Sequence, residues 1–142
     1  IDAILGDAPA FRVIDGQAQQ IMIASDVVLL ASGTAALEAM LCKRPMVIGH
    51  RISALTYRIV KCFGLLKSAH VSLPNVLAGK TLVPELLQDQ CTPDNLHHAL
   101  LHWFTDVDAV AALQPQFLAL HEALRCDASA RAAEAVAEVL PP

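Results

Sequence analysis

Residues 27–38 read VVLLASGTAALE, an apolar run followed by a glycine break and an alanine-rich stretch. Val27–Ala31 is a continuous apolar run without polar alternation, which is typical of a strand buried on both faces of a parallel sheet. Ser32-Gly33 ends the run, and the Ala- and Leu-rich stretch Thr34–Cys42 predicts a helix. The segment therefore predicts a strand, a tight loop and a helix, which is the repeating unit of an α/β protein.

Further strands and helices alternate on both sides of this stretch. We expect strands at Ala10–Ile14, Met46–Gly49 and His70–Leu73, and helices at Gln17–Ser25 and Ser53–Leu66. A short helical turn is expected at Pro84–Gln88. Thr92-Pro93 opens a helix that runs to about Phe104, and further helices are expected at Asp108–Arg125 and Ala128–Leu140. This order predicts an α/β fold, with a Rossmann-like parallel sheet, flanking helices and a helical C-terminal tail.

Length and composition fit one domain with a real core, since the chain has 142 residues and 55% of them are hydrophobic. The most apolar stretch, Ile21–Leu41, is interrupted by Asp26 and Glu38, so it is a poor candidate for a membrane span. The four cysteines form no C-x-x-C pair, which indicates reduced thiols in a cytosolic protein.

Basic residues gather in the middle of the chain, although the net charge is −4. Residues 43–80 contain no acid and the following basic residues: Lys43, Arg44, Arg51, Arg58, Lys61, Lys67 and Lys80. On the expected helix, Arg51, Arg58 and Lys61 share one side, which suits an anionic membrane surface or an acidic lipid. A sheet-covering helix with snorkelling basic side chains is the alternative. Nucleic acid is a poorer partner, because aromatic residues make up only 4% of this acidic chain.

The first candidate site follows the strand at Val27–Ala31, because open parallel sheets bind ligands beyond the carboxyl ends of their strands. Gly33 lets the backbone approach a ligand, and free amides at the helix start, with the Ser32 and Thr34 hydroxyls, can hold phosphate oxygens. Glu38, one turn later, can accept hydrogen bonds from adjacent sugar hydroxyls. Simple helix capping and a helix-dipole role for Glu38 explain the same spacing equally well.

Asn75 is a second candidate, because Ser72-Leu73-Pro74-Asn75 follows another expected strand. Its side chain could bind a phosphate or a sugar, and plain turn chemistry is the alternative. His98 and His102 lie four residues apart without an intervening glutamate, so we prefer a solvated helix face and predict no metal site.

Four stretches resemble the lipid-A-disaccharide synthase family of two-domain (GT-B type) glycosyltransferases. They are ASGTAALEAMLCKRPMVIGHR at 31–51, VSLPNVLAG at 71–79, VPELLQDQCTP at 83–93 and RCDASARAAEAV at 125–136. The resemblance covers essentially the whole chain. The first two stretches together are specific, whereas SGTAALE alone would indicate only a broader GT-B nucleotide-sugar site.

The resemblance implies a reaction and a set of site residues. A 2,3-diacylglucosamine would move from its UDP donor to 2,3-diacylglucosamine 1-phosphate, which gives lipid A disaccharide and UDP. The donor diphosphate would face Ser32, Gly33 and Thr34, Glu38 would lie near the ribose, and Asn75 would match the family's active-site asparagine. No metal or other cofactor is implied, so backbone and cationic groups would stabilise the leaving UDP.

The resemblance also implies an organisation and a location. Residues 1–142 would form an incomplete C-terminal nucleotide-sugar-binding domain, without the N-terminal acceptor domain that would carry the catalytic base. The helical tail would pack on that missing part or exchange with a second subunit in a homodimer. The protein would be cytoplasmic and peripheral on the inner face of the inner membrane of a Gram-negative bacterium. Another GT-B UDP-sugar enzyme and a non-catalytic membrane-binding module are the alternatives.

Overall fold

The computed structural model describes residues 12–31, 33–53 and 70–139. Within them, three strands form a parallel sheet in the order β1 (Val28–Leu30), β2 (Met46–His50) and β3 (Glu85–Leu87). Leu30 lies opposite Ile48, and His50 lies opposite Leu87. The sheet and its flanking helices confirm the predicted α/β fold.

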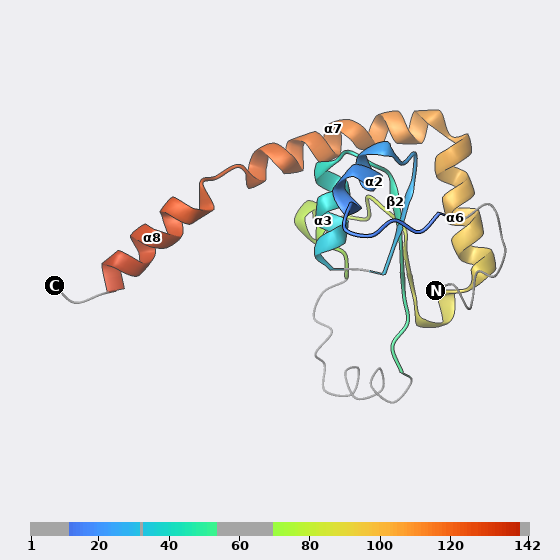
Figure 1. The fold of residues 1–142 in the computed structure, drawn as a ribbon, viewed down its shortest axis with the longest axis horizontal. Helices are drawn as coiled ribbons and strands as arrows, with labels where there is room; N and C mark the ends of the chain where they lie inside the picture. Colours follow the sequence, from blue (N-terminus) through green and yellow to red (C-terminus); the bar gives the residue numbers. More distant parts are fainter. Residues whose placement is uncertain (1–11, 32, 54–69, 140–142) are drawn as a thin grey trace.

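Helices cover both faces of this sheet (Figure 1). The helices are α2 (Ala18–Ala24), α3 (Thr34–Leu41), α5 (Leu73–Ala78), the 3₁₀ turn η1 (Gln88–Gln90), α6 (Pro93–Thr105), α7 (Val107–Leu124) and α8 (Ala128–Val139). On one face α3 packs against α5 and α2, and on the other α6 packs against β2. α7 contacts α3, α5 and α6, and crosses the edge of the sheet at which the strands begin.

The core centres on β2, whose residues Met46, Val47 and Ile48 are fully buried. The Trp103 indole nitrogen of α6 donates to the Met46 carbonyl at 3.2 Å, and Phe117 of α7 is fully buried as well. β2 is therefore the strand buried on both faces. The sequence predicted that position for Val27–Ala31, but β1 is the outer strand of the described sheet and its Leu29 side chain is 49% exposed.

Two further strand predictions were wrong in the described residues. Residues 12–14 form no strand, and Val13 is 61% exposed, because an isolated apolar run gains nothing from an extended backbone without a neighbouring strand. Residues 70–73 form no strand either, because α5 begins at Leu73. Pro74 stands in the first turn of α5, where a helix tolerates proline since its missing N–H has no helical partner there.

The short helix predicted at Pro84–Gln88 is also corrected, because Glu85–Leu87 is a strand. Glutamate and leucine favour a helix locally, but pairing with the end of β2 overrides that preference. The helix predicted from Thr92-Pro93 is confirmed: the Thr92 hydroxyl accepts a bond from the Asn95 amide at 3.3 Å, which caps α6. The helix expected at Ser53–Leu66 falls almost entirely outside the described residues.

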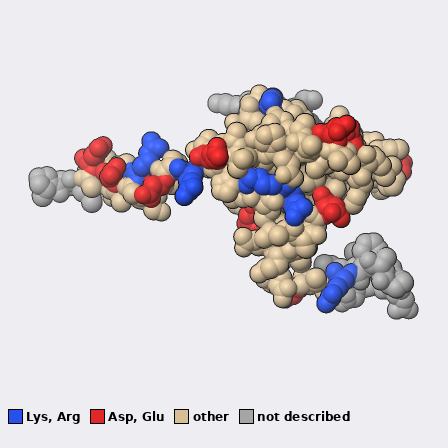
Figure 2. Space-filling view, turned by 90° about the horizontal axis from the view of Figure 1, so that it is seen from above, with Lys and Arg blue, Asp and Glu red and all other residues tan. Residues whose placement is uncertain are grey.

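The predicted tail helices are confirmed as α7 and α8. α8 projects from the body as a separate arm, and all of its residues are exposed (Figures 1 and 2). In the described ranges, no helix combines the length and the apolar character that a bilayer crossing requires.

Replacing Phe117 by alanine tests the core. We expect Phe117→Ala to lower the free energy of unfolding by about 3–5 kcal/mol, because it removes a fully buried ring of the hydrophobic core. Leu118→Ala, at the next position of α7 and 49% exposed, should change it by only about 0.5 kcal/mol. Urea unfolding followed by circular dichroism measures both, and equal losses would contradict the assigned core.

Candidate functional site

The start of α3 lies at the edge of the sheet where β1 ends. Gly33 precedes the helix with φ of 93°, a conformation that glycine adopts without strain and other residues rarely adopt. Gly33 and Thr34 are exposed, and no side chain caps the helix within the described residues. Uncapped amides at a helix start attract anions. Ser32, the other predicted phosphate ligand, lies outside the described residues.

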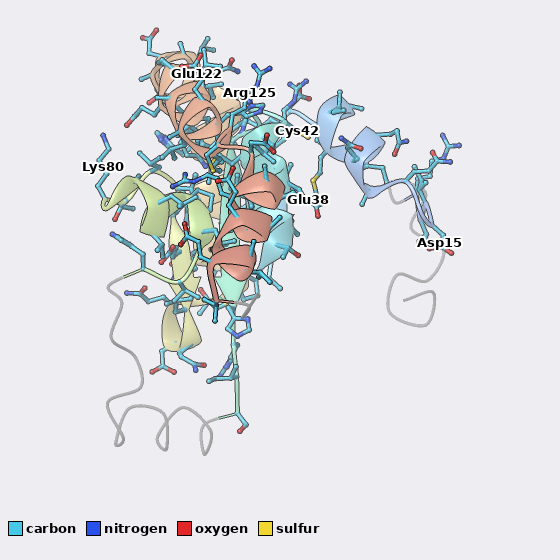
Figure 3. The ribbon with its side chains drawn as sticks, turned by 90° about the vertical axis from the view of Figure 1, so that its left-hand side faces the viewer. Asp15, Glu38, Cys42, Lys80, Glu122 and Arg125 are labelled. Atoms are coloured by element: carbon cyan, nitrogen blue, oxygen red, sulfur yellow. The ribbon has the colours of Figure 1, made fainter. Side chains whose placement is uncertain are left out.

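Glu38 is exposed one turn further along α3, on the side of the helix that carries Thr34. In the described part of the chain its carboxylate has no hydrogen-bond or ion-pair partner. It opens onto a groove of about 530 Å³ between α2, α3 and α7, lined by Gln19, Ile23, Glu38, Leu41, Cys42 and His121. Figure 3 shows Glu38 and Cys42 following one another along α3. An unpaired carboxylate there is free to accept hydrogen bonds from a ligand.

A contact between α3 and α7 closes the far end of this groove. The Lys43 ammonium lies 2.6 Å from His121 Nδ1 and donates to the Leu41 carbonyl at 2.8 Å. Arg44 donates to the Ile23 carbonyl, which joins the end of α2 to the same region. These two cations of the basic segment therefore hold helices together.

The basic segment of the sequence does not form one patch in the described residues. Lys43 and Arg44 precede β2, whereas Arg51 follows it and is exposed beyond the opposite edge of the sheet. Arg58 and Lys61 lie outside the described residues. Seen from the α7 side, acidic and basic side chains are scattered over the body and the α8 arm (Figure 2).

Asn75, the other predicted ligand contact, lies in α5 and is fully buried. Its amide nitrogen donates to the Val83 carbonyl and to Glu85 Oε1, both at 2.9 Å. Its amide oxygen accepts from the Leu82 and Val83 amides at 2.7 and 3.0 Å. The structure therefore places Asn75 inside the protein, where it joins α5 to the start of β3.

Glu85 is the polar residue that sequence reasoning missed, because its stretch was read as a helical turn. Its side chain is only 8% exposed, although it is charged. It accepts bonds from the Val71 amide at 3.0 Å and the Ser72 amide at 2.8 Å, and also from the Ser72 hydroxyl and the Asn75 amide group. Glu85 thus caps the start of α5 from a neighbouring strand.

The environment of Glu85 has two opposing effects on its pKa. Burial by itself raises the pKa, but the hydrogen bonds from Ser72, Val71 and Asn75 outweigh it and lower the pKa below 4.5. The hydrogen bonds therefore keep the Glu85 carboxylate ionised at neutral pH, where it binds the Val71 and Ser72 amides just before α5.

Comparison with known proteins decides the family. A family model described as lipid-A-disaccharide synthetase matches residues 8–136. This chain belongs to the lipid-A-disaccharide synthetase family. It is 64% identical over 129 residues to the lipid-A-disaccharide synthase of Xanthomonas axonopodis pv. citri, and 55% identical over 130 residues to that of Xylella fastidiosa strain 9a5c. The resemblance seen in the sequence is confirmed.

The matches cover 91% and 92% of this chain, but only 29% and 34% of those two synthases. The chain thus spans about a third of the length of the family members it matches. In the part of the chain that the structure describes, no three His, Cys, Asp or Glu side chains gather as a metal site would require.

Because of the Glu85 hydrogen bonds, we expect the free energy of unfolding of this chain to depend on pH. Because the folded-state pKa is lowered, the cap stabilises the fold above about pH 4.5, and this contribution is lost as the pH falls through the lower folded value. We expect Glu85→Gln to cost about 1–3 kcal/mol at pH 7 and progressively less below pH 4.5.

Urea unfolding between pH 7 and pH 3 measures this difference. Asp89→Asn, which removes an exposed carboxylate four residues away, is the matched control and should show almost no loss at any pH. A Glu85→Gln deficit that stays constant down to pH 3 would refute the assigned role of the ionised carboxylate.

Proposed function

We propose that this chain carries the UDP-sugar site of a glycosyltransferase that makes lipid A disaccharide. The observation that carries the proposal is the pairing, on one exposed side of α3, of the helix start at Gly33-Thr34 with the Glu38 carboxylate, neither of which has a side-chain partner within the described residues. The first feature suits a diphosphate, and the second suits the hydroxyl groups of a ribose. Membership of the lipid-A-disaccharide synthetase family supports this pairing of features.

The proposed reaction transfers 2,3-diacylglucosamine from UDP to 2,3-diacylglucosamine 1-phosphate and releases UDP. The backbone amides at the start of α3, with the Thr34 and Ser32 hydroxyls, would hold the diphosphate and stabilise the charge that develops on the leaving UDP. Glu38 would orient the nucleoside by accepting bonds from the ribose. Asn75 would serve the same site, and we propose no metal, no other cofactor and no catalytic base among these residues.

We further propose that the protein works at the cytoplasmic face of the inner membrane. Both substrates of the proposed reaction are anionic lipids, so a basic surface beside the donor site would favour their approach. Arg51 is exposed beyond the end of β2, and Arg58 and Lys61 follow it in the sequence. We propose that these three residues contact lipid, and that the exposed α8 arm serves a homodimer.

A UDP titration tests the donor site. We expect calorimetry to show that the chain binds UDP in preference to ADP, and that Glu38→Ala weakens UDP binding about tenfold or more, because it removes a charged hydrogen-bond acceptor. Glu122→Ala, which removes an exposed glutamate of α7 that does not line the groove, is the matched control.

Equal UDP affinity in the Glu38→Ala and Glu122→Ala variants would remove Glu38 from the site. A folded chain that binds anionic vesicles but no UDP would favour the non-catalytic membrane module. The broader alternative, another GT-B enzyme, is tested in a hybrid in which this chain replaces the matching part of the Xanthomonas synthase. That hybrid should prefer the acylated donor, and equal use of a donor without acyl chains would favour the alternative.

Vesicle binding tests the lipid contact. We expect the triple variant Arg51→Ala/Arg58→Ala/Lys61→Ala to bind vesicles that contain an anionic phospholipid more weakly, by about 1 kcal/mol for each residue. The control removes the same charge elsewhere, with Lys80→Ala/Arg125→Ala/Arg131→Ala. Co-sedimentation at two salt concentrations measures both variants, and equal losses would show that net charge alone governs the binding.

A further inference from the structure

The hydrogen bonds of Asn75 leave no capacity for a ligand. An asparagine side chain has two donor hydrogens and an oxygen with two lone pairs. Both donors are used, on the Val83 carbonyl and Glu85 Oε1, and both lone pairs are used, by the Leu82 and Val83 amides. The side chain is also fully buried. A direct bond to a substrate would have to break one of these internal bonds.

Glu85 and Ser72 extend the same network to the start of α5. Glu85 Oε1 accepts from the Asn75 amide group and from both the amide and the hydroxyl of Ser72, which is itself fully buried. Glu85 therefore connects two points of one short helix, its N-cap and its third residue, to the first residue of β3. The network fixes both the position and the rotation of α5.

The helix that this network fixes packs against the helix of the proposed donor site. α5 contacts α3, and α3 begins at the edge of the sheet where β1 ends (Figure 1). A shift of α5 would move the surface against which α3 packs, and the start of α3 carries Gly33 and Thr34. The network thus has a physical route to the diphosphate position without contact with the ligand.

We propose that Asn75, Glu85 and Ser72 form a positioning network that holds α5 against α3. Asn75 then supports the donor site through the position of α5, without contact with the substrate. This inference rests on the proposed function, because it assigns the network to the UDP-sugar site. It turns the predicted ligand asparagine into a positioning residue and adds Glu85 to the residues on which donor binding depends.

The variant Asn75→Asp separates positioning from direct contact. It replaces the donating amide nitrogen by an oxygen that faces Glu85 Oε1, so two carboxylates would meet at about the present 2.9 Å separation. One of the two must then hold a proton, and it does so more readily as the pH falls. We expect Asn75→Asp to weaken UDP binding about tenfold at pH 8 and to recover part of that loss at pH 5, because one shared proton restores the bond to Glu85 but not the bond to the Val83 carbonyl.

The double variant Asn75→Asp/Glu85→Gln supplies the rescue. A glutamine at position 85 carries no charge, so the new carboxylate no longer meets a second one. The glutamine amide group can donate to that carboxylate, at the expense of the bond from the Ser72 amide. We expect the double variant to bind UDP more tightly than Asn75→Asp at pH 8, with little dependence on pH. Asn75→Ala, which can neither share a proton nor be rescued by Glu85→Gln, should be weak at both pH values.

Calorimetric UDP titrations of the 142-residue chain at pH 5 and pH 8 measure these effects, and Asp89→Asn is the control for a lost carboxylate. His70, with Nδ1 4.0 Å from Glu85 Oε2, is the titratable side chain that the described residues place against Glu85, and it is common to every variant. Thermal melting of each variant ensures that binding is measured on folded protein.

The outcomes separate this inference from the function on which it rests. If the wild-type chain binds UDP but Asn75→Asp shows neither recovery at pH 5 nor rescue by Glu85→Gln, Asn75 contacts the ligand and the positioning network is wrong. If the folded wild-type chain binds no UDP, the proposed function is wrong and the inference falls with it. Recovery together with rescue supports both.

Discussion

β2 pairs with β1 on one side and with β3 on the other, and the arrangement of the described chain depends on this double pairing. A parallel sheet must be covered on both faces, so Met46, Val47 and Ile48 bury their side chains between the α3–α5 layer and α6. Because the strands run in the same direction, the connections after β1 and β2 leave the sheet at one edge. α3 and α5, which follow β1 and β2 in the chain, pack against each other on one face of the sheet (Figure 1).

The two helix starts differ because their amides are satisfied in different ways. α5 receives the Glu85 carboxylate from a neighbouring strand, whereas α3 begins at a glycine with positive φ and receives no side chain within the described residues. Within the described residues, the two amides before α5 thus have an internal carboxylate partner, and the start of α3 has none. Glu38 adds a negative group one turn away, which suits hydroxyl groups better than a second phosphate. The proposed donor site would place the diphosphate at the start of α3 and the ribose near Glu38.

Near the C-terminal end of α3, two basic side chains hold neighbouring helices together. Lys43 contacts His121 of α7, and Arg44 holds the end of α2, so the groove beside Glu38 is bounded by helices that these side chains join. The α8 arm stands apart from this body, with every residue exposed. The family members that this chain matches are about three times as long. We propose that the body presents the donor site and that the arm serves assembly.

The sequence alone was enough to predict the α/β fold class and the family, and it left binding and capping at the start of α3 equally possible. An unbroken apolar run, a Ser-Gly-Thr break and an Ala-rich helix are local signals, and the propensities in them agree with the final structure. Only the tertiary structure decided which strand lies at the centre, since burial on both faces depends on neighbouring strands and not on the composition of the run itself. It also decided that Glu85–Leu87 is a strand and that Asn75 points inward. Both depend on partners distant in sequence, namely Ile48–His50 for the strand and Val83 with Glu85 for the asparagine, and no local pattern specifies such partners.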